Sequence, residues 1–483
     1  MGEEIAKTSF TPEDHAEFER RLAHETKLLG ESLKAGRFSN EGFSLGFEVE
    51  TWILDHNYFP LPVNAELLKA FDNEDAIPEL SKFNVELTCP PRVLEGTVFS
   101  DARAAFETLL GDANEVARGL GGQLVMIGTL PTIREGDLTL DNLTPSKRFY
   151  ALNTEVLRQR GGRPLRIDIE GEERLVSEHY DVMMEAGTTS FQVHLKTPVS
   201  VAHRYFNASV MASAPVLAAA VNAPFLLGKS LWDETRIPLF EQSVDLHGRP
   251  SEKGAPGSPR VTFGSGYAKE SLFELLAENS DSYPGLLPIL FDDPPDHYRH
   301  ISLQNGTLWR WNRPLVGADD TGRPHLRHET RGIPAGPSFL DSLANAAFHI
   351  GLVFHLVAED WDKEPKIPFA DAKANFYAAA RHGLNARFTW PGSDGRSRAG
   401  IAVPELILEE LLPAAREGLR LAGVAPSEAT FFLSIIESRV RTGQTGASWQ
   451  RAFVARHGKD FLRLMSAYCE NQRARLPVHA WAI

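Results

Sequence analysis

The segment at residues 43–53 constrains the fold most, because apolar side chains recur along it with a period of two. This period predicts a β-strand with one apolar face. Alternation then places Glu48 and Glu50 together on the opposite face. Neighbouring carboxylates repel each other unless water or a cation lies between them, and such oxygens suit Mg²⁺ or Mn²⁺. The solvated outer face of an ordinary antiparallel strand explains the same pattern, so the rest of the sequence must decide.

Composition excludes several classes of protein. The chain has 483 residues, which leaves open one large domain with extensions or two domains. Its 42% hydrophobic and 24% charged residues are typical of a soluble globular protein with a core. A net charge of −14 argues against a nucleic-acid or anionic-membrane partner. The two cysteines are too few for a disulfide framework, so we expect a cytoplasmic enzyme in a reducing compartment.

Neither a secretory signal nor a membrane span is expected. Residues 1–35 are too highly charged to supply the apolar core of a signal peptide. The most membrane-like run, residues 205–227, is interrupted by asparagines and prolines, so it indicates a buried, broken helix.

The order of the predicted elements favours an α+β protein. A helix begins at Thr11-Pro12-Glu13-Asp14, and strands or hairpins are expected at residues 43–53, 82–88, 123–127, 165–176, 188–197, 303–312 and 326–331. Pro90-Pro91 is expected to end the second strand. Helices are expected at residues 101–120 and from Val199, and then at 339–361, 371–383, 404–422, 427–441 and 446–475.

The strands mostly lack a regular alternation with helices. We therefore expect a mainly antiparallel sheet with helices on one face, followed by a helical C-terminal part. Residues 245–266, rich in glycine and proline, indicate a loop and a weak internal boundary. We assign residues 1–400 to a catalytic sheet-and-helix domain and residues 401–483 to a helical segment packed on it.

Several predicted strands each carry an acid or another metal-binding group on the face away from the core. These groups are Glu48, Glu50, Glu86, His194 and Glu329. If the strands share one sheet, the groups converge into an oxygen-rich cluster that can hold two or three divalent ions beside a nucleotide phosphate chain. Arg310, Arg327 and Arg331 could bind phosphates or carboxylates with planar guanidinium forks. Taken singly, each residue is equally explained as a solvated or salt-bridged surface group.

The order and spacing of further motifs resemble glutamate–cysteine ligase family 2, the bacterial carboxylate–amine ligases. Gly46-Phe47-Glu48-Val49-Glu50 matches that family's G-x-E-x-E. The resemblance continues through Val85-Glu86-Leu87, Gly128-Thr129-Leu130-Pro131, Leu143-Thr144-Pro145, Arg148-Phe149-Tyr150, Gln192-Val193-His194, Asn222-Ala223-Pro224-Phe225, Trp232-Asp233-Glu234-Thr235-Arg236, Thr307-Leu308-Trp309-Arg310, Arg327-His328-Glu329-Thr330-Arg331, Ala344-Asn345-Ala346-Ala347-Phe348 and Ala380-Arg381-His382-Gly383-Leu384-Asn385-Ala386. It covers roughly residues 40–450.

This resemblance implies a glutamine-synthetase-like fold and an ATP- and Mg²⁺-dependent reaction of the kind used in glutathione biosynthesis. The side-chain carboxylate of glutamate is phosphorylated, and an amine, with cysteine the leading candidate, attacks the acyl phosphate. The five metal-binding groups named above would hold the ions. We expect Arg331 and Arg310 to be catalytic and Arg327 and Arg236 to bind the nucleotide. Gln192 stands where the family often has histidine, so a direct metal role for Gln192 is doubtful.

Two other classes of function remain open at this point. One is a phosphotransferase resembling the guanidino kinases, which would leave a stable phosphorylated product. The other is a non-catalytic binding protein that keeps the fold. The partners expected are small molecules, an amino acid and ATP. The sequence reveals neither the acceptor amine nor the oligomeric state, because acceptor pockets are shaped by loops without a recognisable code.

Overall fold

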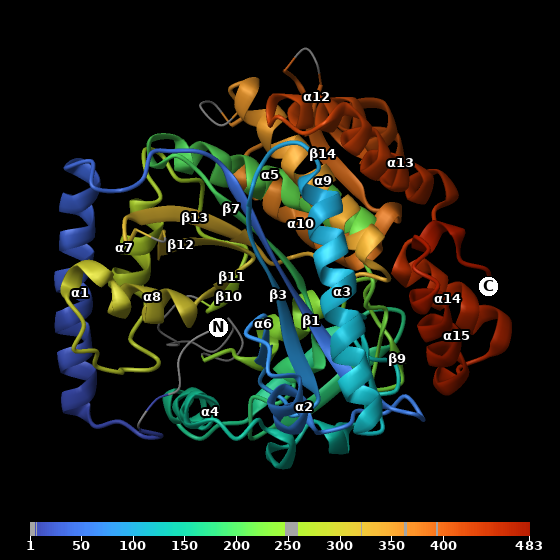
Figure 1. The fold of residues 1–483 in the computed structure, drawn as a ribbon, viewed down its shortest axis with the longest axis horizontal. Coiled ribbons are helices and arrows are strands. Elements are labelled where there is room, and N and C mark those ends of the chain that lie inside the picture. Colours follow the sequence, from blue (N-terminus) through green and yellow to red (C-terminus); the bar gives the residue numbers. More distant parts are fainter. Residues whose placement is uncertain (1–4, 6, 247–258, 320, 362–364, 393–394) are drawn as a thin grey trace.

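A computed structural model describes residues 5, 7–246, 259–319, 321–361, 365–392 and 395–483 (Figure 1). Within the expected loop at residues 245–266, positions 247–258 lie outside the described residues. The described chain is a mixture of helices around one curled sheet, with the C-terminal helices gathered at one side of the molecule.

The centre of the fold is a seven-stranded sheet in the order β12-β13-β7-β1-β3-β2, with β4 also paired to β1. Its strands are β1 (Ser44–Asp55), β2 (Ala76–Pro78), β3 (Asn84–Val93), β4 (Gly122–Val125), β7 (Phe191–Lys196), β12 (Asn312–Ala318) and β13 (Pro324–Thr330). Every pairing in this sheet is antiparallel. The expectation of a mainly antiparallel α+β fold is confirmed.

The register of this sheet brings the acidic positions onto one face. Glu50 is opposite Glu86 across β1 and β3, and Glu48 is opposite Gln192 across β1 and β7. Glu329 on β13 is opposite His194 on β7. Because side chains alternate along each strand, the residues between them point to the other face.

That other face is apolar and is covered by α3 (Val98–Gly119), α5 (Ala202–Ala220) and α9 (Phe339–Ala358). Phe47 stacks on Phe191, with ring centroids 5.9 Å apart, and also contacts Phe99 of α3. Helix α9 is the one helix of the described chain that is long and apolar enough to cross a membrane. Since 83% of its apolar window is buried, α9 is a core helix here.

The remaining helices surround this core, and two of the C-terminal ones, α12 and α13, pack on α9. They are α1 (Pro12–Lys34), α2 (Asn64–Phe71), α4 (Lys147–Gln159), α6 (Arg236–Ser243), α7 (Phe273–Ser282), α8 (Arg299–Gly306), α10 (Phe369–His382), α11 (Val403–Leu406), α12 (Leu412–Leu421), α13 (Pro426–Thr442), α14 (Gly446–His457) and α15 (Phe461–Arg473). Small hairpins lie outside the main sheet, namely β5 (Leu165–Glu170) with β6 (Arg174–His179), β8 (Phe225–Leu226) with β9 (Lys229–Ser230), and β14 (Arg387–Pro391) with β15 (Ser397–Ala402).

Two glycines allow α9 and α12 to approach each other closely. A Cβ atom at Gly418 would lie 1.7 Å from the carbonyl oxygen of Gly351, so a side chain at residue 418 is excluded. A buried ion pair between Arg439 of α13 and Asp341 of α9, at 2.8 Å, ties the next helix to the same core. The proposed division near residue 400 stays a prediction.

Strand β3 does not end at Pro90-Pro91 as expected, because these prolines lie at a β-bulge. Leu45 is paired with Arg92 and Phe47 with Cys89, so the two prolines stand opposite the single residue between. A bulged residue makes no regular ladder bond, and a proline without an N–H group is therefore tolerated there.

Three other expectations about elements were wrong or incomplete. Residues 303–306 belong to α8 and not to a strand. The strands that follow are β11 (Trp309–Arg310), which pairs with β10 (Val261–Thr262), and β12. Glu25 of α1 accepts hydrogen bonds from the backbone N–H groups of His300 and Ile301, and this long-range contact satisfies the start of α8.

The expected helix at 446–475 is two helices, because Gly458 adopts a left-handed φ of 82° between them. The hairpin of β14 and β15 was not foreseen.

The apolar face of the sheet holds the buried His328, which generates a prediction about stability. His328 contacts Ser209 Oγ through Nε2 at 2.7 Å, and burial lowers its pKa to about 3. Since its folded-state pKa lies below the value of about 6.5 in the unfolded chain, stability is lost as pH falls below 6.5. Between pH 7 and pH 5 this histidine should cost the wild type about 2 kcal/mol of unfolding free energy. The variant His328→Gln should not show this loss.

Urea unfolding followed by circular dichroism at both pH values measures this difference. His24→Gln, at an exposed position on α1, is the matched control and should unfold like the wild type at both. An unchanged pH dependence in His328→Gln would show that His328 is not the titrating group.

Candidate active site

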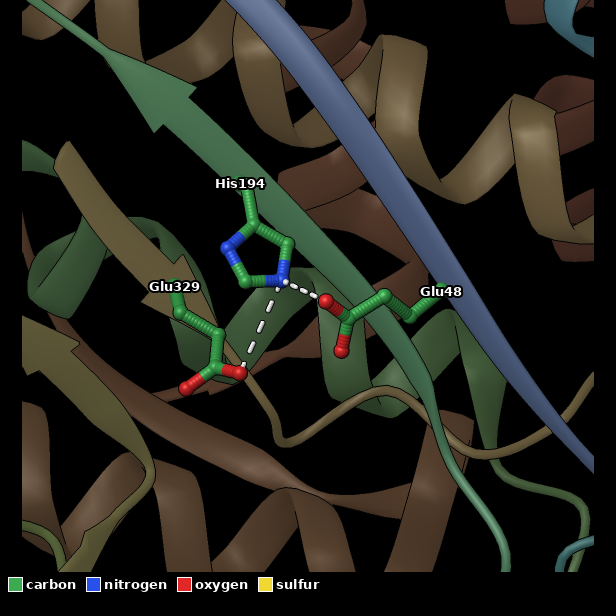
Figure 2. A group of neighbouring side chains, drawn as sticks. All are labelled: Glu48, His194 and Glu329. Atoms are coloured by element: carbon green, nitrogen blue, oxygen red, sulfur yellow. Dashed lines mark ion pairs between the residues drawn. The ribbon is translucent and has the colours of Figure 1, made fainter. Parts of the chain in front are cut away.

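The first group of site residues is Glu48, His194 and Glu329, which lie on the adjacent strands β1, β7 and β13 (Figure 2). His194 Nε2 is 3.1 Å from Glu48 Oε1 and 3.6 Å from Glu329 Oε1. One potential ligand atom from each residue lies within 4.8 Å of the others. The expected convergence of these positions is therefore seen, although their ligand role stays a prediction.

Protein cations offset the charge of this first group. Arg313 Nε is 2.7 Å from Glu329 Oε2, and its Nη2 is 3.2 Å from Oε1, so the two side chains form a fork. Although burial acts to raise the pKa of Glu329, Arg313 and Arg331 hold it well below the usual range. Burial also acts to raise the pKa of Glu48, but His194 lowers it. Both carboxylates are thus charged.

The second group is Glu50, Glu79 and Glu86, whose ligand atoms also lie within 4.8 Å of one another. Glu50 accepts hydrogen bonds from Ser190 N at 2.7 Å and Ser190 Oγ at 2.8 Å. Burial, together with repulsion from nearby carboxylates, raises the pKa of Glu79 and of Glu86 well above the usual value. Each of these two also has a buried oxygen with no hydrogen-bond partner among the described residues. Burial acts to raise the pKa of Glu50 while Arg331 and Arg236 act to lower it, whereas neither Glu79 nor Glu86 has an ion pair within the described residues.

A single cluster of acids was expected, and the structure shows two groups side by side. The separation follows from the pleat, because same-face residues on a strand are about 7 Å apart. Glu48 reaches toward β7 and β13, whereas Glu50 meets Glu86 of β3. Glu79 was missed in the sequence because it precedes β3 and has no place in an alternating strand.

Arg331 lies between the two groups. Its Nη1 is 3.0 Å from Glu329 Oε1 in the first group and 2.6 Å from Gln192 Oε1. Gln192 in turn donates to Glu50 Oε1 of the second group at 3.0 Å. Burial acts to lower the pKa of Arg331, but Glu329 and Glu50 raise it above its usual value.

Arg327 and Arg313 are the other arginines on this face. Burial lowers the pKa of Arg327, whose closest contact is His325 Nε2 at 3.5 Å. Within the described chain no carboxylate forms an ion pair with Arg327, so its guanidinium is available to a ligand. Arg313, opposite Glu329 on β12, was missed because the strand was expected to end at Asn312.

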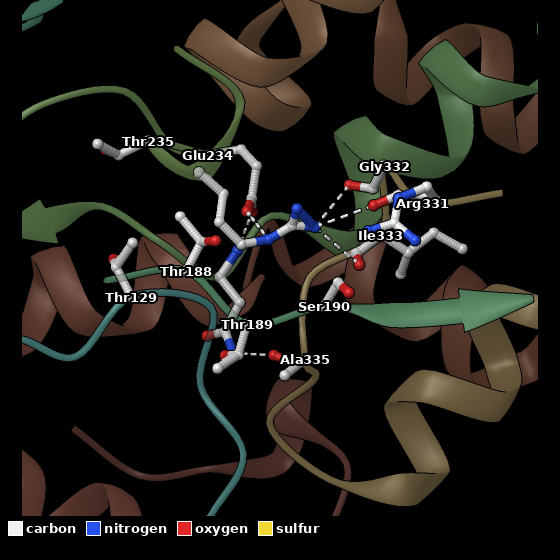
Figure 3. Close-up of polar contacts among 12 residues, drawn as sticks. Thr129, Thr188, Thr189, Ser190, Glu234, Thr235, Arg331, Gly332, Ile333 and Ala335 are labelled. Carbon is white, nitrogen blue, oxygen red and sulfur yellow. Dashed lines mark hydrogen bonds and ion pairs between the residues drawn. The ribbon is translucent and has the colours of Figure 1, made fainter. Parts of the chain in front are cut away.

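The other two arginines singled out in the sequence are held by the protein itself. Arg236 is 2% exposed, and its Nη2 donates to the backbone carbonyls of Arg331, Gly332 and Ile333 (Figure 3). Its Nε lies 3.3 Å from Glu234 Oε1. These contacts position the chain that follows β13, so the expected nucleotide contact of Arg236 stays a prediction.

Arg310 lies with α7 and not with the acidic groups. Its Nη2 donates to Asn279 Oδ1 at 2.9 Å and is 3.2 Å from Glu278 Oε1. The residue is only 3% exposed. Its catalytic role also stays a prediction, and no contact of the described residues joins it to the two acidic groups.

Glu185, which precedes β7, was not singled out in the sequence. Burial and the charge of Glu50 together raise its pKa to about 8, although Arg331 acts in the opposite direction. Its neighbours Met184 and Ala186 are buried, whereas Glu185 is partly exposed. It therefore borders the site on the side of Glu50.

A solved structure shares this fold at low sequence identity. A glutamate–cysteine ligase from Francisella tularensis, solved with AMP, is 14% identical, with a TM-score of 0.56 over 91% of this chain and 90% of that one. A bifunctional glutathione synthetase from Pasteurella multocida is 13% identical, with a TM-score of 0.46 over 95% of this chain and 55% of that one. Among curated proteins, no match was found.

A family comparison covers most of the chain. Residues 44–466 match the model of glutamate–cysteine ligase family 2. The match begins at the first residue of β1 and extends into α15, so it includes every strand of the main sheet and both acidic groups. The chain therefore belongs to glutamate–cysteine ligase family 2, a family of ATP-dependent carboxylate–amine ligases.

Proposed function

We propose that the protein joins the side-chain carboxylate of glutamate to an amine, with cysteine the leading acceptor, through an acyl phosphate. The observation that carries this proposal is the position of Arg331 between two groups of carboxylates on one face of the sheet. Phosphoryl transfer depends mainly on positioning and on stabilising charge, and this face carries both types of group.

The second acidic group supports the use of divalent ions. Three carboxylates within reach of one another, two of them with an unpartnered oxygen among the described residues, are the donor set that Mg²⁺ or Mn²⁺ prefers. In this proposal Glu50, Glu79 and Glu86 hold one ion, and Glu48, His194 and Glu329 hold another. Bound ions would neutralise the triphosphate of ATP.

The chain's own cations have separate tasks in this reaction. A carboxylate oxygen of glutamate attacks the γ-phosphorus, and the bond from that phosphorus to ADP breaks. Arg331 would stabilise the charge of the transferring group with its planar fork, while Arg327 binds nucleotide phosphates. The amine nitrogen then attacks the acyl carbon, phosphate leaves, and the nitrogen loses a proton. Arg313 keeps Glu329 ionised and in place throughout.

Glu50→Gln tests the role of the second acidic group. The amide removes one negative charge but keeps the size of the side chain, so the fold should persist while metal-dependent ATP turnover falls at least a hundredfold. ADP release at increasing Mg²⁺, with circular dichroism as a check of folding, measures both effects. Glu66→Gln, at an exposed position on α2, is the matched control. Normal turnover in Glu50→Gln would remove Glu50 from the mechanism.

Dependence on glutamate tests the donor, and the products test the reaction class. In a mixture of ATP, Mg²⁺ and glutamate, the protein should form ADP, phosphate and an amide only when an amine that it accepts is also present. A panel of amino acids that includes cysteine, analysed by mass spectrometry, identifies the acceptor. A stable phosphorylated product without free phosphate would favour the phosphotransferase alternative. If no amino acid raises ADP release above background, the binding-protein alternative is favoured.

Arg331→Lys tests the contact with the transferring phosphoryl group. Lysine keeps the charge but offers a point charge in place of a fork, so we expect kcat to fall about tenfold or more. The KM for ATP should change little. Steady-state kinetics measures both, with Arg323→Lys at the exposed turn before β13 as the control. A variant that keeps its rate but requires more Mg²⁺ would instead make Arg331 a support for Glu329.

A further inference from the structure

Gln192 occupies the space between the two acidic groups, on β7. The residue is 1% exposed, and its side chain forms one hydrogen bond in each direction. Its Oε1 accepts from Arg331 Nη1 at 2.6 Å, and its Nε2 donates to Glu50 Oε1 at 3.0 Å. Within the part of the chain that the structure describes, this amide links Arg331 to Glu50 by a hydrogen bond on each side.

The chemistry of the two partners dictates which way this amide points. Guanidinium groups only donate hydrogen bonds, so the atom that faces Arg331 must be the carbonyl oxygen. Glu50 also accepts from Ser190 N and Ser190 Oγ, so the atom that faces Glu50 must be a donor. A flipped amide would place two donors against each other on one side and two acceptors on the other.

This orientation disfavours Gln192 as a ligand of a metal ion. An amide side chain binds a cation through its carbonyl oxygen, and here that oxygen accepts a short hydrogen bond from a charged donor. The amide nitrogen is directed to Glu50 and has no lone pair to offer. Gln192 thus lies among the acidic groups without competing for an ion.

A neutral spacer at this place also keeps opposite charges apart. Arg331 and Glu50 already interact electrostatically, and Arg331 Nη1 is shared between Gln192 and Glu329. Without the amide, the guanidinium would be free to move onto the Glu50 carboxylate, because an ion pair is stronger than a bond to an amide. That movement would withdraw the fork from its position and occupy the oxygens of Glu50.

We propose that Gln192 is a positioning residue that holds Arg331 at a fixed place and leaves Glu50 open to a cation. This inference rests on the proposed function, since it assigns Arg331 to the phosphoryl group. The role of Gln192 is exerted through Arg331 and not by contact with the substrate.

Three variants test this inference. Gln192→Leu removes both hydrogen bonds, so kcat should fall at least tenfold while the KM for ATP stays within about twofold. Gln192→His can replace both bonds, because a neutral imidazole has one donor and one acceptor, and its kcat should stay within about threefold of the wild type. Gln192→Glu keeps the acceptor for Arg331 but repels Glu50, so its kcat should fall at least tenfold. Thermal unfolding of each variant checks the fold.

A Mn²⁺ titration of the full chain without substrates, followed by electron paramagnetic resonance, separates positioning from metal binding. Gln192→Leu should bind Mn²⁺ at most about threefold more weakly, because Arg331 then competes for Glu50, whereas Glu50→Gln should bind it at least tenfold more weakly. Equal loss of Mn²⁺ affinity in both variants would overturn the inference, as would a normal kcat in Gln192→Leu. A wild type without glutamate-dependent ADP release would contradict the proposed function. The Mn²⁺ titration would still decide whether Gln192 is a ligand.

Discussion

Repulsion between closely placed carboxylates is the constraint on which the rest of this structure depends. Six of them border one face of the sheet, namely Glu48, Glu50, Glu79, Glu86, Glu185 and Glu329. Charges buried without partners are strongly unfavourable, so such an array persists only where cations or protons offset it. Arg313 and Arg331 do so for one group, whereas in the other group burial and repulsion between carboxylates raise the pKa values of Glu79 and Glu86.

The opposite face of the same strands supplies the packing that holds this array together. Phe47 and Phe191 alternate with the acidic positions of β1 and β7, and they are buried against α3. Helix α9 is in turn fixed by its close approach to α12 at Gly351 and by the Arg439–Asp341 pair. A site of like charges needs a rigid support, since loosely held carboxylates would move apart into water.

Neutral hydrogen-bonding groups then distribute the charges within the site. Ser190 and Gln192 both donate to Glu50, and Gln192 transmits the position of that carboxylate to Arg331. Arg236 fixes the backbone just after β13 through three carbonyl groups (Figure 3). The arginine proposed to act on the phosphoryl group is thereby held from both its side chain and its backbone.

The sequence by itself determined the alternation of β1, the antiparallel α+β class, the family, and the face on which Glu48, Glu50, Glu86, His194 and Glu329 lie. These features follow from local periodicity and from the order of motifs, which are both written along the chain. Only the tertiary structure decided that the acids form two groups, that Glu79 and Arg313 join them, and that Arg310 lies with α7. It also decided that Pro90-Pro91 forms a bulge opposite Gly46 and that residues 303–306 are helical. Those outcomes depend on which strands pair, in which register, and on what distant segments pack beside them, and no periodicity within one segment carries that information.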